Sequence, residues 1–255
     1  MSLEQQISEL FAQRDELADS ITGKWVSCIH DAFYGPYATE RGSNKFLELE
    51  TTLAHTFAGL SAIDAGAFWR LTVLVLLRLA QKTLGTETTD ARIGKGDELD
   101  ETDSNKATNL KKTHKKSKKK AQPNAPLAFM VVNALRTLTE EENSCGQFIQ
   151  DQEKEMLEDF CVRGLQDSNF VDQKLVVEIL DLFTITDVDA QIVQGAAQSL
   201  LVSKKYTALV KLLTIFNSLE WSFEAMIKTM TKCKDWAAAE LLVRTFGSPE
   251  DKGNV

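Results

Sequence analysis

The fold of this chain is decided by a stretch that occurs twice: Lys-Lys-Tyr-Thr-Ala-Leu-Val-Lys-Leu-Leu-Thr-Ile-Phe at residues 204–216, and Lys-Asp-Trp-Ala-Ala-Ala-Glu-Leu-Leu-Val-Arg-Thr-Phe at residues 234–246. An offset of thirty residues aligns the two copies. Six pairs of positions then match: Lys204 with Lys234, Tyr206 with Trp236, Ala208 with Ala238, Leu212 with Leu242, Leu213 with Val243, and Phe216 with Phe246. From the aromatic residue onward most of these positions share one helical face, so the pattern predicts the same amphipathic helix in two copies.

Such a helix cannot bury its apolar face alone, and helical units of this period stack on one another in α-solenoids. We expect the aromatic residue to pack on an adjacent helix, the alanine to let backbones approach, and the leucine pair and terminal Phe to fill the layer between hairpins. Lys211 and Arg244 should then face solvent. The alternative is that two helices rich in Leu, Ala and Lys align through composition alone. Residues 173–183 have a similar spacing of apolar residues and are a candidate for a degenerate earlier copy of the repeated helix.

The composition favours an all-α protein. Leu, Ala, Glu, Gln and Lys fill most of the 255 residues, Gly and Pro are sparse, and 43% hydrophobic residues are enough for a substantial core. The net charge of −8 differs from that of proteins that coat nucleic acid, which match phosphates with Lys and Arg. The N-terminus has no pattern of a secretory or transit peptide. The apolar run at 65–80 is short for a membrane span and contains Arg70 and Arg78, so it predicts a buried central helix.

Apolar periodicity divides the chain into units. We predict an N-terminal helical unit at 1–85, a disordered linker at 86–126, a C-terminal helical-repeat unit at 127–247 and a disordered tail at 248–255. The first unit is expected to hold four helices, the first of them with Leu3, Leu17 and Ile21 on its buried face. Further helices are expected at 125–138, 147–165, 170–184, 188–202, 204–217, 221–231 and 234–246. Connections this short join antiparallel neighbours, so this part should be a series of helical hairpins.

The predicted linker is polarised by charge. Residues 87–103 hold seven acids and two bases, whereas 106–120 hold eight lysines and no acid. The basic block includes Lys111, Lys112, Lys115, Lys116, Lys118, Lys119 and Lys120. Its charge suits contact with RNA phosphates, nuclear import receptors or acidic protein. The plainer alternative is a solvated loop that the preceding acidic block neutralises.

No constellation for catalysis, metal or cofactor stands out. Cys28, Cys145, Cys161 and Cys233 form no CxxC pair and have no histidine at a metal-ligand spacing. Cys28 and His30 are two residues apart on a predicted helix, so they point to different faces and do not form a nucleophile and base pair. Phosphate-binding loops, nucleophile elbows and HExxH helices are absent. We therefore expect a non-enzymatic intracellular protein with no cofactor, no metal and no small-molecule substrate.

From Lys204 to Phe246 the order is a helix, a bridge at 217–224, a short helix at 225–230, and then Cys233 to Trp236 entering the last helix. This part resembles the helical-repeat N-terminal region of Nibbler-like 3′-to-5′ exonucleases, the family that trims small-RNA ends and includes the nematode mutator exonucleases. The resemblance implies an α-solenoid that contacts RNA or a partner protein and precedes a DEDD-type nuclease domain. None of the nuclease motifs occurs in this sequence, so no catalytic residue is carried over. The chain is expected to be a truncated or stand-alone version of the accessory region.

The expected protein is thus an all-α scaffold of antiparallel hairpins that form a short α-solenoid, interrupted by the charged linker. Its concave or apolar-grooved face would recruit a protein partner, with RNA as the other partner class, in the cytoplasm or nucleus and away from membranes. The alternative is a general protein-interaction adaptor of the armadillo or HEAT type with a basic nuclear-targeting loop.

Overall fold

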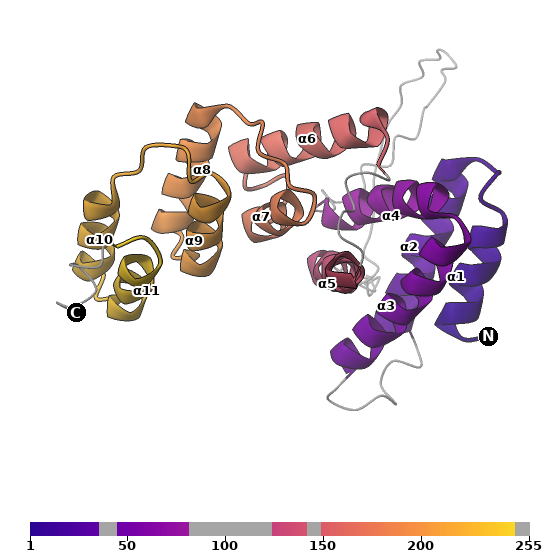
Figure 1. Ribbon diagram of the computed structural model, residues 1–255. Coiled ribbons are helices and arrows are strands. Elements are labelled where there is room, and N and C mark those ends of the chain that lie inside the picture. Colours follow the sequence, from indigo (N-terminus) through magenta and orange to yellow (C-terminus); the bar gives the residue numbers. More distant parts are fainter. Residues whose placement is uncertain (36–44, 82–123, 142–148, 248–255) are drawn as a thin grey trace, which may run out of the picture. The chain divides into compact units, whose positions relative to one another are not determined.

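The computed structural model describes residues 1–35, 45–81, 124–141 and 149–247, which belong to one compact unit (Figure 1). These residues form eleven helices, and the one strand-like feature among them is an isolated bridge between Gln81 and Val171. The predicted all-α fold is confirmed. Most of the predicted linker at 86–126 and the whole predicted tail at 248–255 lie outside the described residues.

The N-terminal part holds four helices: α1 (Leu3–Ala12), α2 (Ala18–Tyr34), α3 (Lys45–Ile63) and α4 (Ala65–Ala80). The prediction that Leu3, Leu17 and Ile21 share one helix is wrong, because the chain turns after Ala12. The N–H groups of Gln13 and Arg14 donate to carbonyls three residues back, which tightens and ends α1. Leu17, expected on the buried face, is 81% exposed at the start of α2.

The apolar run at 65–80 forms the buried helix α4, as the sequence predicts. Asp64 caps its N-terminus, because the Asp64 carboxylate accepts the N–H of Ala67 at 3.0 Å. Along α4 the side chains of Phe68 and Leu76 are fully buried, and the helix contacts α2, α3, α5 and α6. Of the helices that the structure describes, none is long and apolar enough to cross a membrane.

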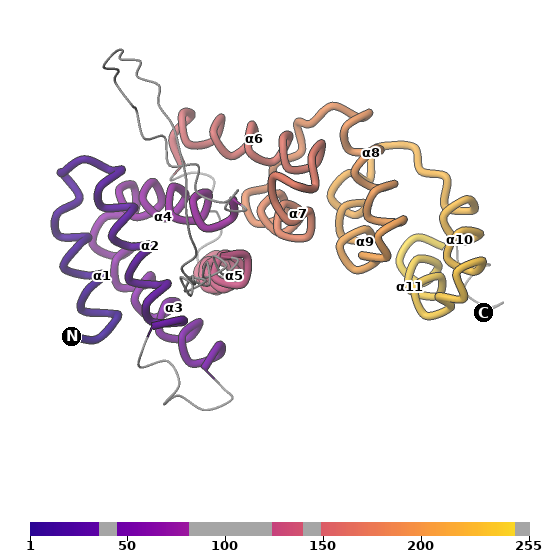
Figure 2. Tube along the Cα trace, turned by 180° about the vertical axis from the view of Figure 1, so that it is seen from behind, coloured from indigo at the N-terminus to yellow at the C-terminus, as the bar shows by residue number. Residues whose placement is uncertain are grey.

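The remaining helices are α5 (Ala125–Glu141), α6 (Asp151–Gln166), α7 (Gln173–Leu182), α8 (Ala190–Val202), α9 (Tyr206–Ile215), α10 (Phe223–Lys232) and α11 (Trp236–Phe246). They pair as hairpins, α6 with α7, α8 with α9 and α10 with α11. Helices α4, α6 and α8 contact one another in succession, and so do α5, α7, α9 and α11 (Figures 1 and 2). The helices therefore form two rows, in which α10 and α11 are the last described hairpin.

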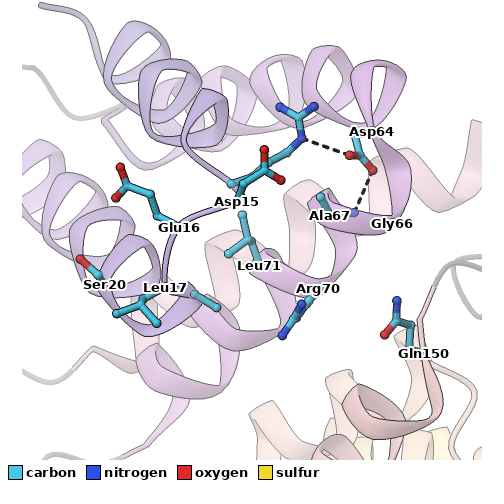
Figure 3. Close-up of a pocket in the computed structure, with 12 residues that line it drawn as sticks. Asp15, Glu16, Leu17, Ser20, Asp64, Gly66, Ala67, Arg70, Leu71 and Gln150 are labelled. Carbon is cyan, nitrogen blue, oxygen red and sulfur yellow. Dashed lines mark hydrogen bonds and ion pairs between the residues drawn. The ribbon is translucent and has the colours of Figure 1, made fainter.

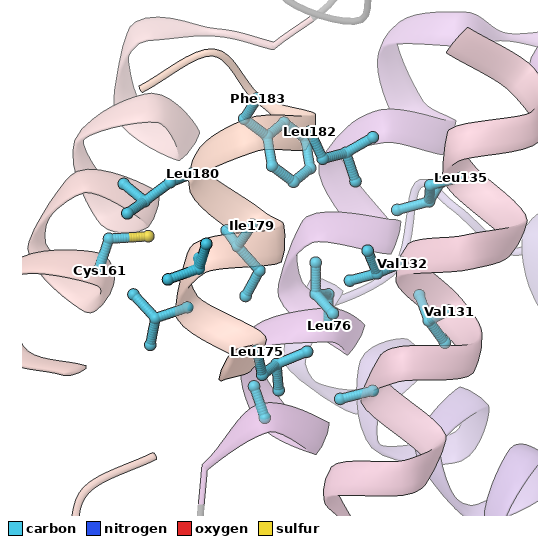
Figure 4. Packing of buried hydrophobic residues seen from close by; sticks show 14 of the residues in the cluster. Leu76, Val131, Val132, Leu135, Cys161, Leu175, Ile179, Leu180, Leu182 and Phe183 are labelled. Carbon is cyan, nitrogen blue, oxygen red and sulfur yellow. The ribbon is translucent and has the colours of Figure 1, made fainter. Parts of the chain in front are cut away.

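One continuous apolar core joins the helices before and after the predicted linker. Figure 4 shows Leu76 of α4, Val132 of α5 and Ile179 of α7 meeting in this core, and all three are fully buried. Gly164 of α6 also brings two helices close together. A Cβ atom there would lie 2.5 Å from a Val171 methyl and 2.6 Å from a Val176 methyl, so the approach of α6 to α7 requires glycine.

Candidate partner-binding surface

The turns that join α8 to α9 and α10 to α11 have the same backbone conformation, thirty residues apart. Lys204 and Lys234 have φ values of 58° and 62°, a left-handed conformation that is uncommon for residues with a side chain. The next residues, Lys205 and Asp235, have φ and ψ of −90° and 58° and of −92° and 64°. Each of these two donates its N–H to the carbonyl five residues earlier at 2.9 Å, as in a Schellman motif. The two turns thus share backbone geometry; the same cap also ends α7, where Thr184 has a φ of 53° and the Ile185 N–H donates to the Leu180 carbonyl at 2.9 Å.

The positions predicted to form the repeat core are buried differently in the two copies. In α9 the buried positions are Ala208, Leu212, Leu213 and Phe216, and Tyr206 is half-buried. In α11 only one of the matched positions, Leu242, is buried. Ala238, Val243 and Phe246 are half-buried, and Trp236 is exposed. The first copy is therefore enclosed, whereas the second is open on one side.

Two expectations about side-chain placement are wrong. Trp236 was expected to pack on an adjacent helix, but 66% of its surface is exposed, because among the described residues no helix follows α11 to cover it. Lys211 was expected to face solvent, but its ammonium lies 2.6 Å from Glu178 and 2.8 Å from Asp181. Arg244 is exposed, as expected.

Lys211 belongs to an ionic cluster that joins three helices. Arg136 of α5 donates to Asp181 at 2.7 Å and to Glu178 at 2.6 Å, and Lys211 of α9 contacts the same two carboxylates of α7. Burial opposes ionisation of Asp181, but the hydrogen bonds and charges of Lys211 and Arg136 outweigh it, so the pKa of Asp181 is lowered. Two cations and two anions balance here, so the cluster ties helices together and has no surplus charge for a ligand.

A row of polar contacts joins the N-termini of α7, α9 and α11. Asp172, the N-cap of α7, accepts from the ammonium of Lys205 at 2.9 Å. Asp235 of the last turn accepts from the Tyr206 hydroxyl at 2.7 Å and lies 3.1 Å from the Lys204 ammonium. The N-termini of neighbouring helices are therefore linked by ion pairs, Lys205 with Asp172 and Lys204 with Asp235.

These contacts keep both carboxylates ionised. The hydrogen bond from Tyr206 and that from Lys204 lower the pKa of Asp235, and the same Tyr206 bond raises the pKa of the tyrosine to about 12. Burial raises the pKa of Asp172, but the hydrogen bonds from the Lys205 side chain and the Lys174 N–H outweigh this, and the net pKa is lowered. At neutral pH both groups act as acceptors only.

An apolar groove of about 420 Å³ lies between α10 and α11. Its lining residues are Phe223, Glu224, Ile227, Leu242, Val243, Phe246 and Gly247. The rings of Phe223 and Phe246 are stacked with centroids 5.0 Å apart, which fixes one wall of the groove. Trp236 and Leu241 add exposed apolar surface to the same hairpin. Apolar surface of this kind in a concave site is typical of a binding surface.

The matched face of the preceding hairpin is covered. Thirty residues before Phe223 and Ile227 lie Val193 and Ala197, which are buried, and the positions matched to Val243 and Phe246 are Leu213 and Phe216, also buried. The residues of α10 that line the groove were missed by the sequence analysis. Extending the thirty-residue alignment backward from Lys204 would have found them, because residues 193, 196, 197 and 200 and their counterparts 223, 226, 227 and 230 are all apolar.

A larger and more polar cavity of about 1060 Å³ lies beside the α1–α2 turn and the start of α4 (Figure 3). Arg14 and Arg70 line it, and both are already paired. Arg14 Nε lies 3.1 Å from Asp64, which also caps α4, and Arg70 Nε lies 3.3 Å from the buried Glu153 of α6. The N–H of Ala67, and then Arg14, lower the pKa of Asp64 despite some opposing burial. The charges in this cavity thus hold the helices in place.

Two of the described cysteines have thiols that are less acidic than usual. Burial, and then the nearby Asp31, raise the pKa of the Cys28 thiol, which keeps it protonated at neutral pH. Burial raises the pKa of Cys161 in the same way. Within the part of the chain that the structure describes, no group of three His, Cys, Asp or Glu side chains could hold a metal ion. Cys145 and the lysine block Lys111 to Lys120 lie outside the described residues.

Comparisons with protein-family models, with curated proteins and with solved structures find no match to this chain. The resemblance to the accessory region of Nibbler-like exonucleases therefore stays a prediction.

Proposed function

We propose that the chain is a non-enzymatic α-helical scaffold, a short α-solenoid, and that it binds a protein partner through the open face of the α10–α11 hairpin. One observation carries the proposal: positions that are buried on α8–α9 are only half-buried on α10–α11, where they line an apolar groove. The two rows of helices and the repeated turn support stacking of this kind. A stacked unit whose outer face is apolar needs a cover, and a partner can supply it.

The groove favours a moderate affinity. Full burial of an apolar side chain such as Phe or Ile is worth about 1.5–3 kcal/mol, and Phe223, Ile227, Val243 and Phe246 are already half-buried, so each gains only part of this. Association also costs several kcal/mol in lost translational and rotational freedom. The groove therefore suits a reversible complex in which neighbouring polar contacts add specificity.

RNA is the competing partner class. The groove is lined by apolar residues and one acid, Glu224, and phosphate recognition needs basic side chains. The charge of the lysine block at 111–120 suits RNA phosphates, whereas the resemblance to the exonuclease family implies that the solenoid itself contacts RNA or a partner protein. We favour the protein partner because the apolar lining of the groove has the chemistry of protein–protein contact.

Site-specific photo-cross-linking tests the proposal. A photoreactive phenylalanine analogue at Val243, inside the groove, should form discrete protein adducts in cells that express the chain. The same analogue at Thr207, an exposed position on the enclosed copy, serves as the matched control. Adducts at Val243 should disappear in an Ile227→Glu background. Equal labelling from both positions, or adducts indifferent to Ile227→Glu, would reject the groove as the binding surface.

A gel-shift titration with single-stranded RNA at low and moderate salt tests the competing class. RNA binding that falls steeply with salt and is lost when residues 111–120 are deleted would identify the lysine block as an RNA contact. Binding that survives this deletion and is lost in Ile227→Glu would assign RNA to the groove and overturn the proposal.

A further inference from the structure

The chain already contains one example of a hairpin docked on the face in question. Helix α11 of the α10–α11 hairpin contacts α9, and at the turn before α11 Asp235 accepts from the Tyr206 hydroxyl at 2.7 Å and lies 3.1 Å from the Lys204 ammonium. Lys204 holds the left-handed turn position, and Tyr206 is the first residue of α9. The carboxylate of the α10–α11 turn, Asp235, thus interacts with two donors at the α8–α9 turn, Tyr206 and Lys204.

The same two positions on the last turn carry the same kinds of donor. Lys234 matches Lys204 in sequence and in its left-handed φ, and Trp236 matches Tyr206 as the first residue of its helix. An indole N–H donates a hydrogen bond as a phenol does. Among the described residues neither the Lys234 ammonium nor the Trp236 indole has a hydrogen bond or ion pair, and Trp236 is 66% exposed. Lys234 and Trp236 are therefore two unused donors on the last hairpin that the structure describes.

The apolar part of the docking face continues from these donors. Tyr206 and Leu213 are seven residues apart, so they lie on one side of α9, the side that faces α11. Trp236 and Val243 have the same spacing on α11, and Val243 opens into the groove. A partner that contacts α11 as α11 contacts α9 would fill the groove with apolar side chains and place its turn against Lys234 and Trp236.

We infer that the open end binds an antiparallel α-helical hairpin of a partner protein, which carries a carboxylate at its turn that Lys234 and Trp236 receive. This inference rests on the proposed function and specifies the chemistry of the partner. The occupant is a helical hairpin because the equivalent helix, α9, contacts α11 of a helical hairpin within this chain, with Asp235 of that hairpin's turn bound to Tyr206 and Lys204. It is acidic at its turn because the receiving positions are a cation and a neutral N–H donor, which complement an anion.

The inference can be tested in the full chain by adding a second copy of the α10–α11 hairpin after α11. A second copy of residues 217–246, inserted between Phe246 and Gly247, places a hairpin in the register of the repeat. Trp236→Phe in the inserted copy alone gives the tryptic peptide of the original Trp236 a unique mass. Hydroxyl-radical footprinting then measures oxidation of that indole in the parent and extended chains. We expect its oxidation rate to fall several-fold, toward that of the fully buried Trp25.

Charge reversal separates the predicted contact from general packing. Asp235→Lys in the inserted copy alone should restore oxidation of the original Trp236. The turn tolerates this change, because the matched position of the preceding repeat is Lys205 with nearly the same φ and ψ. Adding Lys234→Glu in the original turn should restore protection, since the charges are then exchanged. Circular dichroism checks that all versions keep their helix content.

Each outcome decides the inference. The inference is supported if the original Trp236 is protected in the extended chain, loses this protection with Asp235→Lys in the inserted copy, and regains it when Lys234→Glu is added. An unprotected Trp236 in the extended chain, or protection indifferent to both reversals, overturns it. Protection in the parent chain that grows with protein concentration would make a second copy the occupant and also overturn it. If the insertion fails while Val243 still cross-links to a groove-dependent partner, the proposed function stands and only the hairpin chemistry is wrong.

Discussion

The hairpins α8–α9 and α10–α11 have nearly the same turn and the same pattern of apolar positions, but they differ in what lies against them. In the first, Leu213 and Phe216 are buried, whereas in the second, Val243 and Phe246 remain half-buried around a groove. The difference teaches that a repeated helix defines an apolar face, and that the neighbouring elements decide whether this face is buried or partly exposed.

The largest expected effect comes from removing the terminal Phe of each copy. Phe216→Ala should lower the free energy of unfolding by about 3–5 kcal/mol, because the ring is buried and its loss leaves a cavity. Phe246→Ala should cost roughly 1–2 kcal/mol, since its ring is half-buried and solvent can fill the space. Urea unfolding of both variants measures the difference, and equal losses would contradict the contrast between the hairpins.

Removing the cation that holds α9 to α7 should have a smaller effect. Lys211→Met leaves Glu178 and Asp181 paired only with Arg136, and we expect a loss of about 1–2 kcal/mol in unfolding free energy. Arg244→Met is the matched control. Its partner Glu240 lies one turn away on the same exposed face, so the change should stay within about 0.5 kcal/mol. An unaffected Lys211→Met variant would show that the contacts of Lys211 with α7 add no stability.

Acid should weaken the contacts between hairpins. The pKa values of Asp172, Asp181 and Asp235 are lowered from the usual 3.8 by their cationic and hydrogen-bonding partners. A carboxylate with a lowered folded pKa stabilises the fold above its unfolded pKa, and this contribution is lost as pH falls through the folded pKa. Unfolding free energy should therefore fall below about pH 4. Lys211→Met should lose less over this range, because its Asp181 pKa lies nearer the usual value; an identical acid slope would exclude Asp181 as a contributor.

The smallest effect is expected at Trp236. The sequence alone predicts a loss of about 3–5 kcal/mol for Trp236→Ala, as for a buried ring. The structure exposes 66% of this residue, so the free energy of unfolding should change by no more than about 0.5 kcal/mol. Chemical denaturation measures this value. A loss comparable to that of Phe216→Ala would mean that the ring is covered in solution.

The sequence predicts the helices better than their surroundings. Apolar periodicity is a local signal, so the helices from 125 onward and the buried α4 follow from it. The division between α1 and α2 was missed because Leu3, Leu17 and Ile21 fit one helical period even though the chain turns between them. The environments of Lys211 and Trp236 depend on helices distant in sequence. The ionic cluster joins residues 136, 178, 181 and 211, and no spacing within one helix reveals such a contact.

Native-state hydrogen exchange of the parent chain tests the central contrast most directly. Helices α9 and α11 are of similar length and follow the same kind of turn. A difference in amide protection between them therefore reports how well neighbouring helices cover each one. We expect amides of α11 near Leu242 and Val243 to exchange at least about tenfold faster than those of α9 near Leu212 and Leu213, a difference of about 1.4 kcal/mol in opening free energy. Equal protection of α9 and α11 would contradict the account, since it would mean that the last hairpin is already enclosed.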